Sequence, residues 1–208
     1  MYRLLPANPI VVEAGAYNGD DTYRMARLWP QGRIYALEPI PALYHRLIAR
    51  TAELPNVRTF PLALGDRTGN QIMYRSAGSS DASSSLLPPR AHLEFHPAVS
   101  FEHQLVIQAS TLDDFFHSLP EQRLDLLWLD IQGMELAVLK KGEAALRCAD
   151  HLFLEVHFVE SYEGCATFPI LRQWLSERGY RLAWLDDRYA DAGNALFVRR
   201  GHRQKQTT

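Results

Sequence analysis

The chain has 208 residues, of which 47% are hydrophobic and 22% charged, and a formal net charge of −2. This length fits one domain with a sizeable core. The net charge shows no excess of basic residues of the kind that nucleic-acid-binding proteins have, so we expect no nucleic-acid partner. Cys148 and Cys165 lack metal-ligand spacing, the start Met1–Pro6 lacks a signal-peptide pattern, and no apolar stretch approaches the roughly 20 residues of a membrane span. We therefore expect a cytoplasmic protein with no membrane span.

The first predicted element is a buried strand over residues 10–13 that breaks into a loop containing Gly15 and Gly19. Glycines permit backbone angles or close approaches that a side chain would prevent, so a ligand can touch the main chain here. A helix is predicted over Thr22–Leu28, with Asp20 or Asp21 as its N-cap, and its start would present backbone N–H groups to the loop. A simple strand-turn-helix, with glycines that serve only the turn, remains the alternative.

The ligand class follows from the acid that ends this strand. Glu13 would repel a pyrophosphate, and the spacing G-x-x-x-G differs from the dinucleotide fingerprint G-x-G-x-x-G. Both features favour a ligand with a cationic part, such as the amino group of a methionine moiety. A nicotinamide oxidoreductase therefore ranks low among the functions considered.

Alternating strands and helices continue to about residue 64. A strand over 33–37 ends at Glu38 and Pro39, a helix over 42–53 follows Pro41, and a third strand begins at 56–60 and runs to 62–64. This order predicts a parallel sheet with helices on both faces, whose ligands bind beyond the carboxyl ends of the strands. Glu13, Glu38 and the pair Ala63–Leu64 should therefore lie near one another.

The middle of the chain departs from this alternation. Residues 76–85 are small and polar and predict a mobile loop, which is either a surface linker or a lid within an insertion over 76–101. The flanking segments Gln71–Arg75 and His103–Gln108 are expected to pair as antiparallel strands. Thr111 and Asp114 have capping-box spacing and predict a helix start, which leaves Asp113 unexplained.

The last third predicts the rest of one α/β domain over residues 1–198. Strands at 124–130 and 150–157 alternate with helices at 134–146 and 168–178, and Gly179 closes the second helix. Two final strands, at 180–185 and 194–198, predict an antiparallel hairpin, and hence a seven-stranded, mostly parallel sheet with an antiparallel last strand. Residues 199–208 are basic and polar and are expected to be frayed.

Several predicted strands thus end in acidic residues or a histidine, whose side chains can bind ligands or transfer protons. Glu13, Glu38 and Asp130 each follow a core strand, and Glu155 and His157 fall at the same rim. An acid after the second strand suits a bidentate contact to the two hydroxyls of a ribose, which favours Glu38 for that role. The chain lacks a P-loop and a G-x-S-x-G elbow, so neither phosphoryl transfer nor hydrolysis is supported.

Taken together, these motifs resemble the FkbM family of S-adenosylmethionine-dependent methyltransferases over residues 10–198. The resemblance rests on residues 13–20, 37–39, 63–66, 111–115 and 129–135 in that order and spacing. It implies a class I, Rossmann-like methyltransferase fold that uses S-adenosylmethionine, with the methionine part near Glu13, the ribose near Glu38 and the adenine beside Ala63 and Leu64. The full set of expected cofactor-binding residues is Glu13, Gly15, Asn18, Gly19, Asp20, Thr22, Glu38, Pro39, Ala63, Leu64 and Asp130.

The resemblance also implies an acceptor class and frames a mechanism. The family typically methylates hydroxyl oxygens of sugars or secondary metabolites, so a small-molecule hydroxyl acceptor such as a sugar, glycolipid or polyketide is expected. His157 is the first candidate for the base that removes the acceptor proton, and Asp130 is the alternative. A structural role for His157, or an amine-orienting role for Asp130, would compete with these assignments. The family usually has Glu where this chain has Gln132, and we assign Gln132 no acid-base role.

Further expectations concern metal binding, the source of acceptor selection and an alternative, non-catalytic function. Hard ligands are available from Asp113, Asp130, Glu135, Glu155 and His157, but no short metal signature joins them, so we expect no obligatory metal. Acceptor selection would come from the insertion over 76–101, from the rim of the fifth strand, or from a second subunit of a homodimer. A binding module that holds S-adenosylmethionine or another nucleoside without transferring a methyl group is the alternative function.

Overall fold

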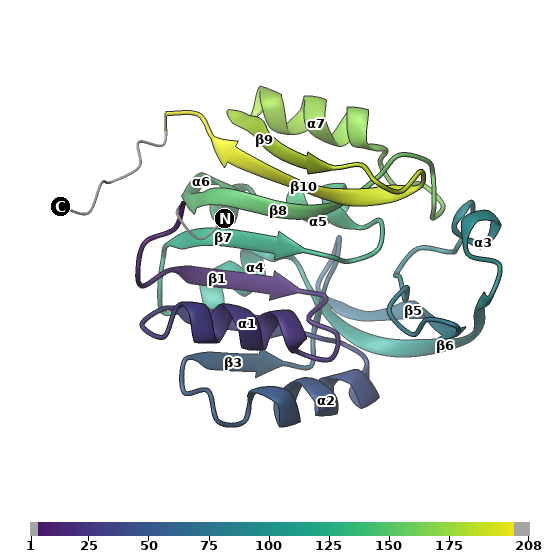
Figure 1. The fold of residues 1–208 in the computed structure, drawn as a ribbon, viewed down its shortest axis with the longest axis horizontal. Coiled ribbons are helices and arrows are strands. Elements are labelled where there is room, and N and C mark those ends of the chain that lie inside the picture. Colours follow the sequence, from purple (N-terminus) through teal and green to yellow (C-terminus); the bar gives the residue numbers. More distant parts are fainter. Residues whose placement is uncertain (1–3, 202–208) are drawn as a thin grey trace.

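The computed structural model describes residues 4–201. Its main sheet contains seven strands, which are β1 (Ile10–Ala14), β2 (Arg33–Leu37), β3 (Val57–Phe60), β7 (Leu124–Leu129), β8 (Ala149–His157), β9 (Tyr180–Asp186) and β10 (Ala192–Arg199). They lie in the order β3-β2-β1-β7-β8-β10-β9 (Figure 1). The pairs from β3 to β8 are parallel, whereas β10 is antiparallel to both β8 and β9. This arrangement confirms the predicted seven-stranded sheet with an antiparallel last strand.

Helices cover both faces of this sheet, as predicted. One face carries α1 (Asp20–Leu28) and α2 (Pro41–Thr51), and the other packs against α4 (Leu112–Ser118), α5 (Glu135–Leu139), α6 (Glu143–Cys148) and α7 (Phe168–Glu177). Successive strand residues point to opposite faces, so Val11 packs with Met25 of α1 while Val12 shares a cluster with Phe115 of α4. The central strands are therefore buried on both sides.

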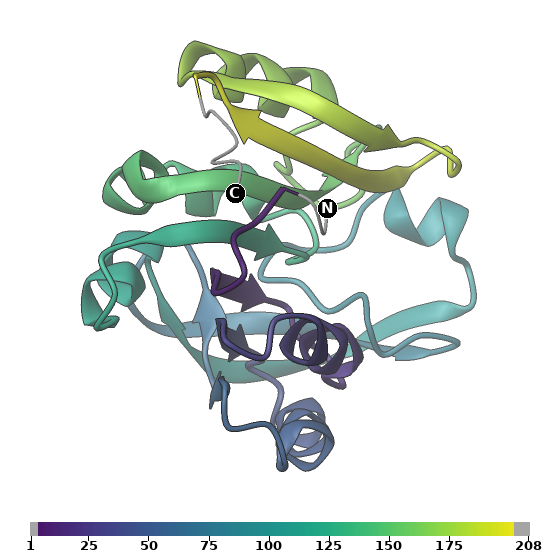
Figure 2. The ribbon, with the colours of Figure 1, turned by 60° about the vertical axis from the view of Figure 1, so that its left-hand side comes forward.

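A second, three-stranded sheet lies beside the main one (Figure 2). It consists of β4 (Ala63–Leu64), β5 (Gly69–Gly78) and β6 (Val99–Ser110), in the order β4-β6-β5. The antiparallel pairing of β5 with β6 is confirmed, for example by the partners Arg75 and His103. The prediction that the third core strand continues to residue 64 is wrong, because the chain leaves the main sheet after Phe60 and Ala63 instead pairs with β6.

Helix boundaries also differ from prediction, most clearly at the start of α1 and between α5 and α6. The helix α1 begins at Asp20, and its N-cap is Gly19 at φ +85°, with no side-chain cap, so the predicted capping by Asp20 or Asp21 is wrong. The helix expected over 134–146 is interrupted between α5 and α6. The interruption places Gly142 where a Cβ would lie 2.3 Å from the Leu112 side chain, so the chain approaches α4 too closely for a larger residue.

The start of α4 is as predicted, and it resolves the question about Asp113. The Thr111 hydroxyl accepts a hydrogen bond of 3.1 Å from the Asp114 amide, which is the expected cap. The Asp113 carboxylate instead accepts hydrogen bonds from the amides of Ala144 and Ala145, at 3.1 and 2.9 Å. Asp113 thus caps α6, a helix about thirty residues further along the chain.

The C-terminal hairpin is confirmed, and both of its strands are longer than the predicted 180–185 and 194–198. Arg199 belongs to β10, and its guanidinium donates to the Ala149 carbonyl and the Tyr180 hydroxyl at 3.0 and 2.8 Å. Of the predicted frayed tail, residues 202–208 lie outside the described residues. Over residues 4–201, no helix has the length and apolar character needed to cross a membrane.

Candidate active site

A cavity of about 570 Å³ opens at the carboxyl ends of β1, β2 and β7. This volume and this position are typical of ligand sites in open α/β sheets. Most of the predicted site residues line the cavity, namely Glu13, Gly15, Asn18, Glu38, Pro39, Ala63, Leu64, Asp130 and His157. Segments far apart in the sequence therefore meet at one edge of the sheet.

Gly15 allows the first loop to lie directly against the end of β7. Its φ is +83°, and a Cβ at this position would lie 1.8 Å from the backbone oxygen of Asp130. The Asp130 amide also donates a hydrogen bond of 3.0 Å to the Ala14 carbonyl. No side chain larger than hydrogen fits between the two segments without moving them apart.

Three predicted cofactor residues lie behind the cavity wall. A Cβ on Gly19 would lie 2.9 Å from the Leu47 side chain of α2, so this glycine allows α1 and α2 to pack closely. Asp20 forms an ion pair of 2.8 Å with Arg50. The buried Thr22 hydroxyl donates a hydrogen bond of 2.5 Å to Glu13. The contacts of Gly19, Asp20 and Thr22 therefore stabilise the loop. Direct contact of these three residues with a cofactor stays a prediction.

The Glu38 carboxylate holds two loops together at the cavity wall. Its oxygens accept hydrogen bonds from the Tyr17 amide at 3.0 Å and the Ile40 amide at 2.8 Å. Each oxygen keeps a further lone pair, which suits two hydroxyl donors. Glu38 is only 4% exposed, and burial raises its pKa to about 7.

Two other acids of the rim lie at the site, where Glu13 is buried and Asp130 is half-buried. Burial raises the pKa of both Glu13 and Asp130 to about 8. Within residues 4–201, neither these two acids nor Glu38 forms an ion pair. Buried carboxylates without a basic partner are costly when ionised, and a cationic ligand would reduce that cost.

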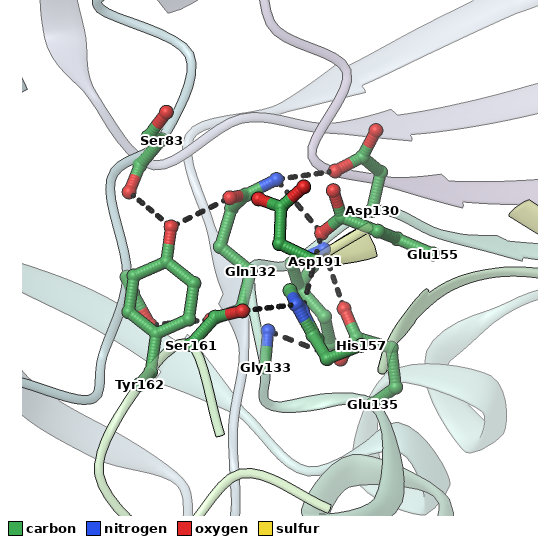
Figure 3. Close-up of polar contacts among 12 residues, drawn as sticks. Ser83, Asp130, Gln132, Gly133, Glu135, Glu155, His157, Ser161, Tyr162 and Asp191 are labelled. Carbon is green, nitrogen blue, oxygen red and sulfur yellow. Dashed lines mark hydrogen bonds and ion pairs between the residues drawn. The ribbon is translucent and has the colours of Figure 1, made fainter. Parts of the chain in front are cut away.

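Gln132 connects the end of β7 to β8 and to the loop that follows β8 (Figure 3). Its side-chain nitrogen donates to Asp130 at 2.9 Å and to Glu155 at 2.8 Å, and its side-chain oxygen accepts from the Tyr162 hydroxyl at 2.7 Å. A Glu here would lack the two donors and add a third acid to the pair. The amide therefore fits between the two carboxylates of this chain.

Glu135 closes the turn between β7 and α5. Its two carboxylate oxygens accept hydrogen bonds from the amides of Ile131 at 3.0 Å and Gly133 at 3.1 Å. Burial raises its pKa to about 7. Glu135 lies in the first turn of α5, and the hydrogen bonds of its side chain are with this β7–α5 turn.

His157 is 2% exposed and has one nitrogen without a hydrogen-bond partner among the described residues. Its Nδ1 shares a hydrogen bond of 3.2 Å with the Ser161 hydroxyl, whereas Nε2 lies 3.5 Å from a Glu155 oxygen (Figure 3). The Nδ1 contact orients the ring, and the unbonded Nε2 is available to a proton or ligand. Ser161 was not recognised in the sequence, because no motif surrounds it.

The segment Ser79–Ser84 of the insertion forms one wall of the cavity. At one end, Asp81 accepts a hydrogen bond from the Tyr17 hydroxyl. At the other, the Ser83 carbonyl oxygen lies 2.9 Å from the Tyr162 hydroxyl and shares its single proton with the Gln132 side-chain oxygen, and the Ser85 hydroxyl donates to the Gln132 carbonyl at 2.7 Å. The segment therefore lines the cavity, and its role as a lid stays a prediction.

Two groups of possible metal ligands occur among the described residues. Glu135, Glu155 and His157 place one ligand atom each within 4.8 Å of one another, and so do His92, His96 and Asp191. The second group was not recognised in the sequence, because its members are far apart and lack a known signature. Asp113, another predicted metal candidate, belongs to α4, and its carboxylate accepts hydrogen bonds from backbone amides at the start of α6. The expectation of no obligatory metal stays a prediction.

The topology and the cavity define a class I methyltransferase fold. Among solved structures, the chain is similar to Aeropyrum pernix fibrillarin in complex with natively bound S-adenosyl-L-methionine, with a TM-score of 0.54 and 13% identity. The alignment covers 94% of this chain and 68% of the fibrillarin chain. Residues 13–182 match the methyltransferase FkbM domain, so the chain belongs to that family of S-adenosylmethionine-dependent methyltransferases.

Two relatives extend this comparison at the sequence level. The 2-O-methyltransferase NoeI of Sinorhizobium fredii (strain NBRC 101917 / NGR234) is 29% identical over 162 residues, which cover 76% of this chain and 67% of the relative. Methyltransferase sdnD of Sordaria araneosa is 27% identical over an alignment of 215 positions, gaps included, that covers 89% of this chain and 81% of the relative. The resemblance to the FkbM family and the expected cofactor class are thus confirmed.

Proposed function

We propose that the protein transfers a methyl group to a hydroxyl oxygen of a sugar or a similar polyhydroxylated small molecule. The observation that carries this proposal is the polar part of the cavity wall outside the cofactor loops, to which the serine-rich segment Ser79–Ser84, with Asp81, and His157 contribute. Hydroxyl, imidazole and carboxylate groups are the partners that a polyol acceptor needs. The similarity to a relative described as a 2-O-methyltransferase supports the same class of acceptor.

The residues of the other wall fit S-adenosylmethionine. The cationic ammonium and sulfonium groups of the cofactor would favour the ionised forms of Glu13 and Asp130, and neither acid has a competing ion pair in residues 4–201. Glu38 has lone pairs free for the two ribose hydroxyls. The remaining proposed cofactor contacts are the loop residues Gly15 and Asn18, and Pro39, Ala63 and Leu64 around the adenine.

When bound, S-adenosylmethionine supplies a methyl group that is already activated by the positive sulfur. The protein then has to hold the acceptor oxygen in line with that methyl group and remove the hydroxyl proton. His157 Nε2 would accept this proton, because it lines the cavity and has no hydrogen-bond partner among the described residues. Glu155, 3.5 Å away, would stabilise the imidazolium that results.

Asp130 is the alternative base, and its contacts favour a different role. Gln132 donates to one of its oxygens, and burial raises its pKa to about 8, so much of it is protonated at neutral pH without a ligand. A nearby cationic ligand would lower that pKa and stabilise the carboxylate. We therefore assign Asp130 to orientation of the cofactor and His157 to proton removal.

The test compares His157→Ala and Asp130→Asn with His103→Ala, which changes an exposed histidine on β6. Methyl transfer to a panel of glycosides and polyols gives kcat, and calorimetric titration with S-adenosylmethionine gives the dissociation constant. We expect His157→Ala to lower kcat by about 10²–10⁴-fold at unchanged cofactor affinity, and Asp130→Asn to weaken cofactor binding. Full activity in both variants would exclude His157 and Asp130 as the base. Cofactor binding without methyl transfer to any tested substrate would favour the alternative of a binding module.

A further inference from the structure

Two histidines of the insertion and one aspartate of the C-terminal hairpin meet at the mouth of the cavity. His92 and His96 lie four residues apart at the short helix α3 (His92–Phe95), with their ring centroids 4.6 Å apart. Asp191 precedes β10, and its carboxylate lies 2.7 Å from His96 Nε2. Figures 1 and 2 both show α3 next to the connection between β9 and β10. All three side chains line the cavity.

One atom of this group lacks a partner although it is buried. His92 is 7% exposed, and its Nε2 has no hydrogen-bond partner among the described residues. Its ring is held in place by stacking on Tyr162, with ring centroids 5.3 Å apart. A buried polar atom without a partner is uncommon, because it loses its contacts with water and gains nothing in return. An ion or another ligand that binds Nε2 would remove this cost.

The group has the composition and spacing of a transition-metal site. Two imidazoles and a carboxylate suit Zn²⁺, Co²⁺, Ni²⁺, Mn²⁺ or Fe²⁺, whereas Mg²⁺ and Ca²⁺ prefer oxygen ligands alone. One ligand atom from each residue lies within 4.8 Å of the other two. Ligand atoms around a tetrahedral Zn²⁺ lie about 3.4 Å apart, so side-chain rotation would close the site.

We propose that His92, His96 and Asp191 bind a divalent transition-metal ion that links the insertion to the C-terminal hairpin. Three protein ligands leave at least one coordination position for water or for a hydroxyl of a bound molecule. The ion would also fix α3 at the rim of the cavity. This inference concerns ion binding alone and does not depend on the proposed methyl acceptor.

The contacts of the inner group, Glu135, Glu155 and His157, make it the weaker candidate. Both oxygens of Glu135 already accept hydrogen bonds from backbone amides, and Glu155 accepts one from Gln132. An ion there would compete with these donors. In the outer group, the carboxylate of Asp191 forms a hydrogen bond only with His96 among the described residues, and His96 is itself a ligand of the proposed ion.

The experiment is a titration of the full-length, untagged protein with Co²⁺ after dialysis against a chelator. Visible absorption reports ligand-field bands, and calorimetry gives stoichiometry and affinity. The test variants are His96→Ala, which removes a half-exposed ring, and Asp191→Asn. The controls are His103→Ala, an exposed histidine on β6, and Glu155→Gln in the inner group.

We expect Co²⁺ affinity to fall by more than about tenfold in both test variants and to remain unchanged in both controls. Co²⁺ should also raise the melting temperature of the original protein but not that of His96→Ala, whose own melting temperature without metal shows whether it folds. Equal Co²⁺ affinity in the original protein and His96→Ala would overturn the proposal. A loss confined to Glu155→Gln would also overturn it, since the ion would then bind the inner group.

Discussion

The close approach of Gly15 to Asp130 allows a sharp test of how the cofactor wall is built. In Gly15→Ala, the new Cβ would lie 1.8 Å from the Asp130 backbone oxygen, whereas real Cβ atoms rarely come closer than 3.0 Å. The two segments must therefore separate by at least 1.2 Å, the difference between these distances. A displacement of about 1 Å among positioned groups can reduce function by about 100-fold. We expect a loss of S-adenosylmethionine affinity of that order.

A substitution at a second glycine serves as a control that separates the effect of this clash from the effect of backbone strain. Gly179, after α7, has the same φ of +83°, but a Cβ there would meet nothing within 4 Å. Both substitutions place alanine in a left-handed conformation, which costs about 1–2 kcal/mol of stability. Gly179→Ala should therefore lower the melting temperature and leave cofactor affinity unchanged.

The assay is calorimetric titration of both variants with S-adenosylmethionine, accompanied by thermal unfolding. Gly15→Ala should lose affinity beyond any effect of Gly179→Ala. A folded Gly15→Ala protein with the original dissociation constant would refute the argument, since the loop and the end of β7 could then separate without consequence for the cofactor.

Two further predictions concern stability. Asp113→Ala removes the acceptor for the Ala144 and Ala145 amides, so urea unfolding should show a loss of about 1–2 kcal/mol, with cofactor affinity unchanged; an unchanged urea midpoint would count against this cap. Burial raises the pKa of Glu13 from 4.5 to about 8, so between these pH values the folded state keeps a proton that the unfolded state has released. The melting temperature of the ligand-free protein should therefore fall as pH rises through this range, and Glu13→Gln should make the melting temperature depend less steeply on pH. An equal dependence in both proteins would contradict the raised pKa of Glu13.

The order of the sheet and the cofactor rim were predictable from local patterns. An apolar run that ends in an acid marks the carboxyl end of a strand, as at Glu13, Glu38 and Asp130. Once alternating helices indicate a parallel sheet, these ends must share one edge. The positions of the three acids around one cavity follow from that rule.

The contacts between distant side chains were not predictable in the same way. Asp113 caps a helix that begins thirty residues later, and Asp191 reaches a histidine in the insertion. Such pairs depend on how loops fold over the sheet, and neither periodicity nor spacing encodes this. The early end of the third core strand and the N-cap at Gly19 were missed because tertiary packing overrode local preference.

A crystal structure with bound S-adenosylhomocysteine, the product form of the cofactor, would test the central claim most directly. The account predicts that the nucleoside occupies the cavity at the ends of β1, β2 and β7, with its ribose hydroxyls on Glu38 and its amino group near Glu13 or Asp130. A ligand bound elsewhere, or one whose ribose and amino group contact none of these three carboxylates, would contradict it.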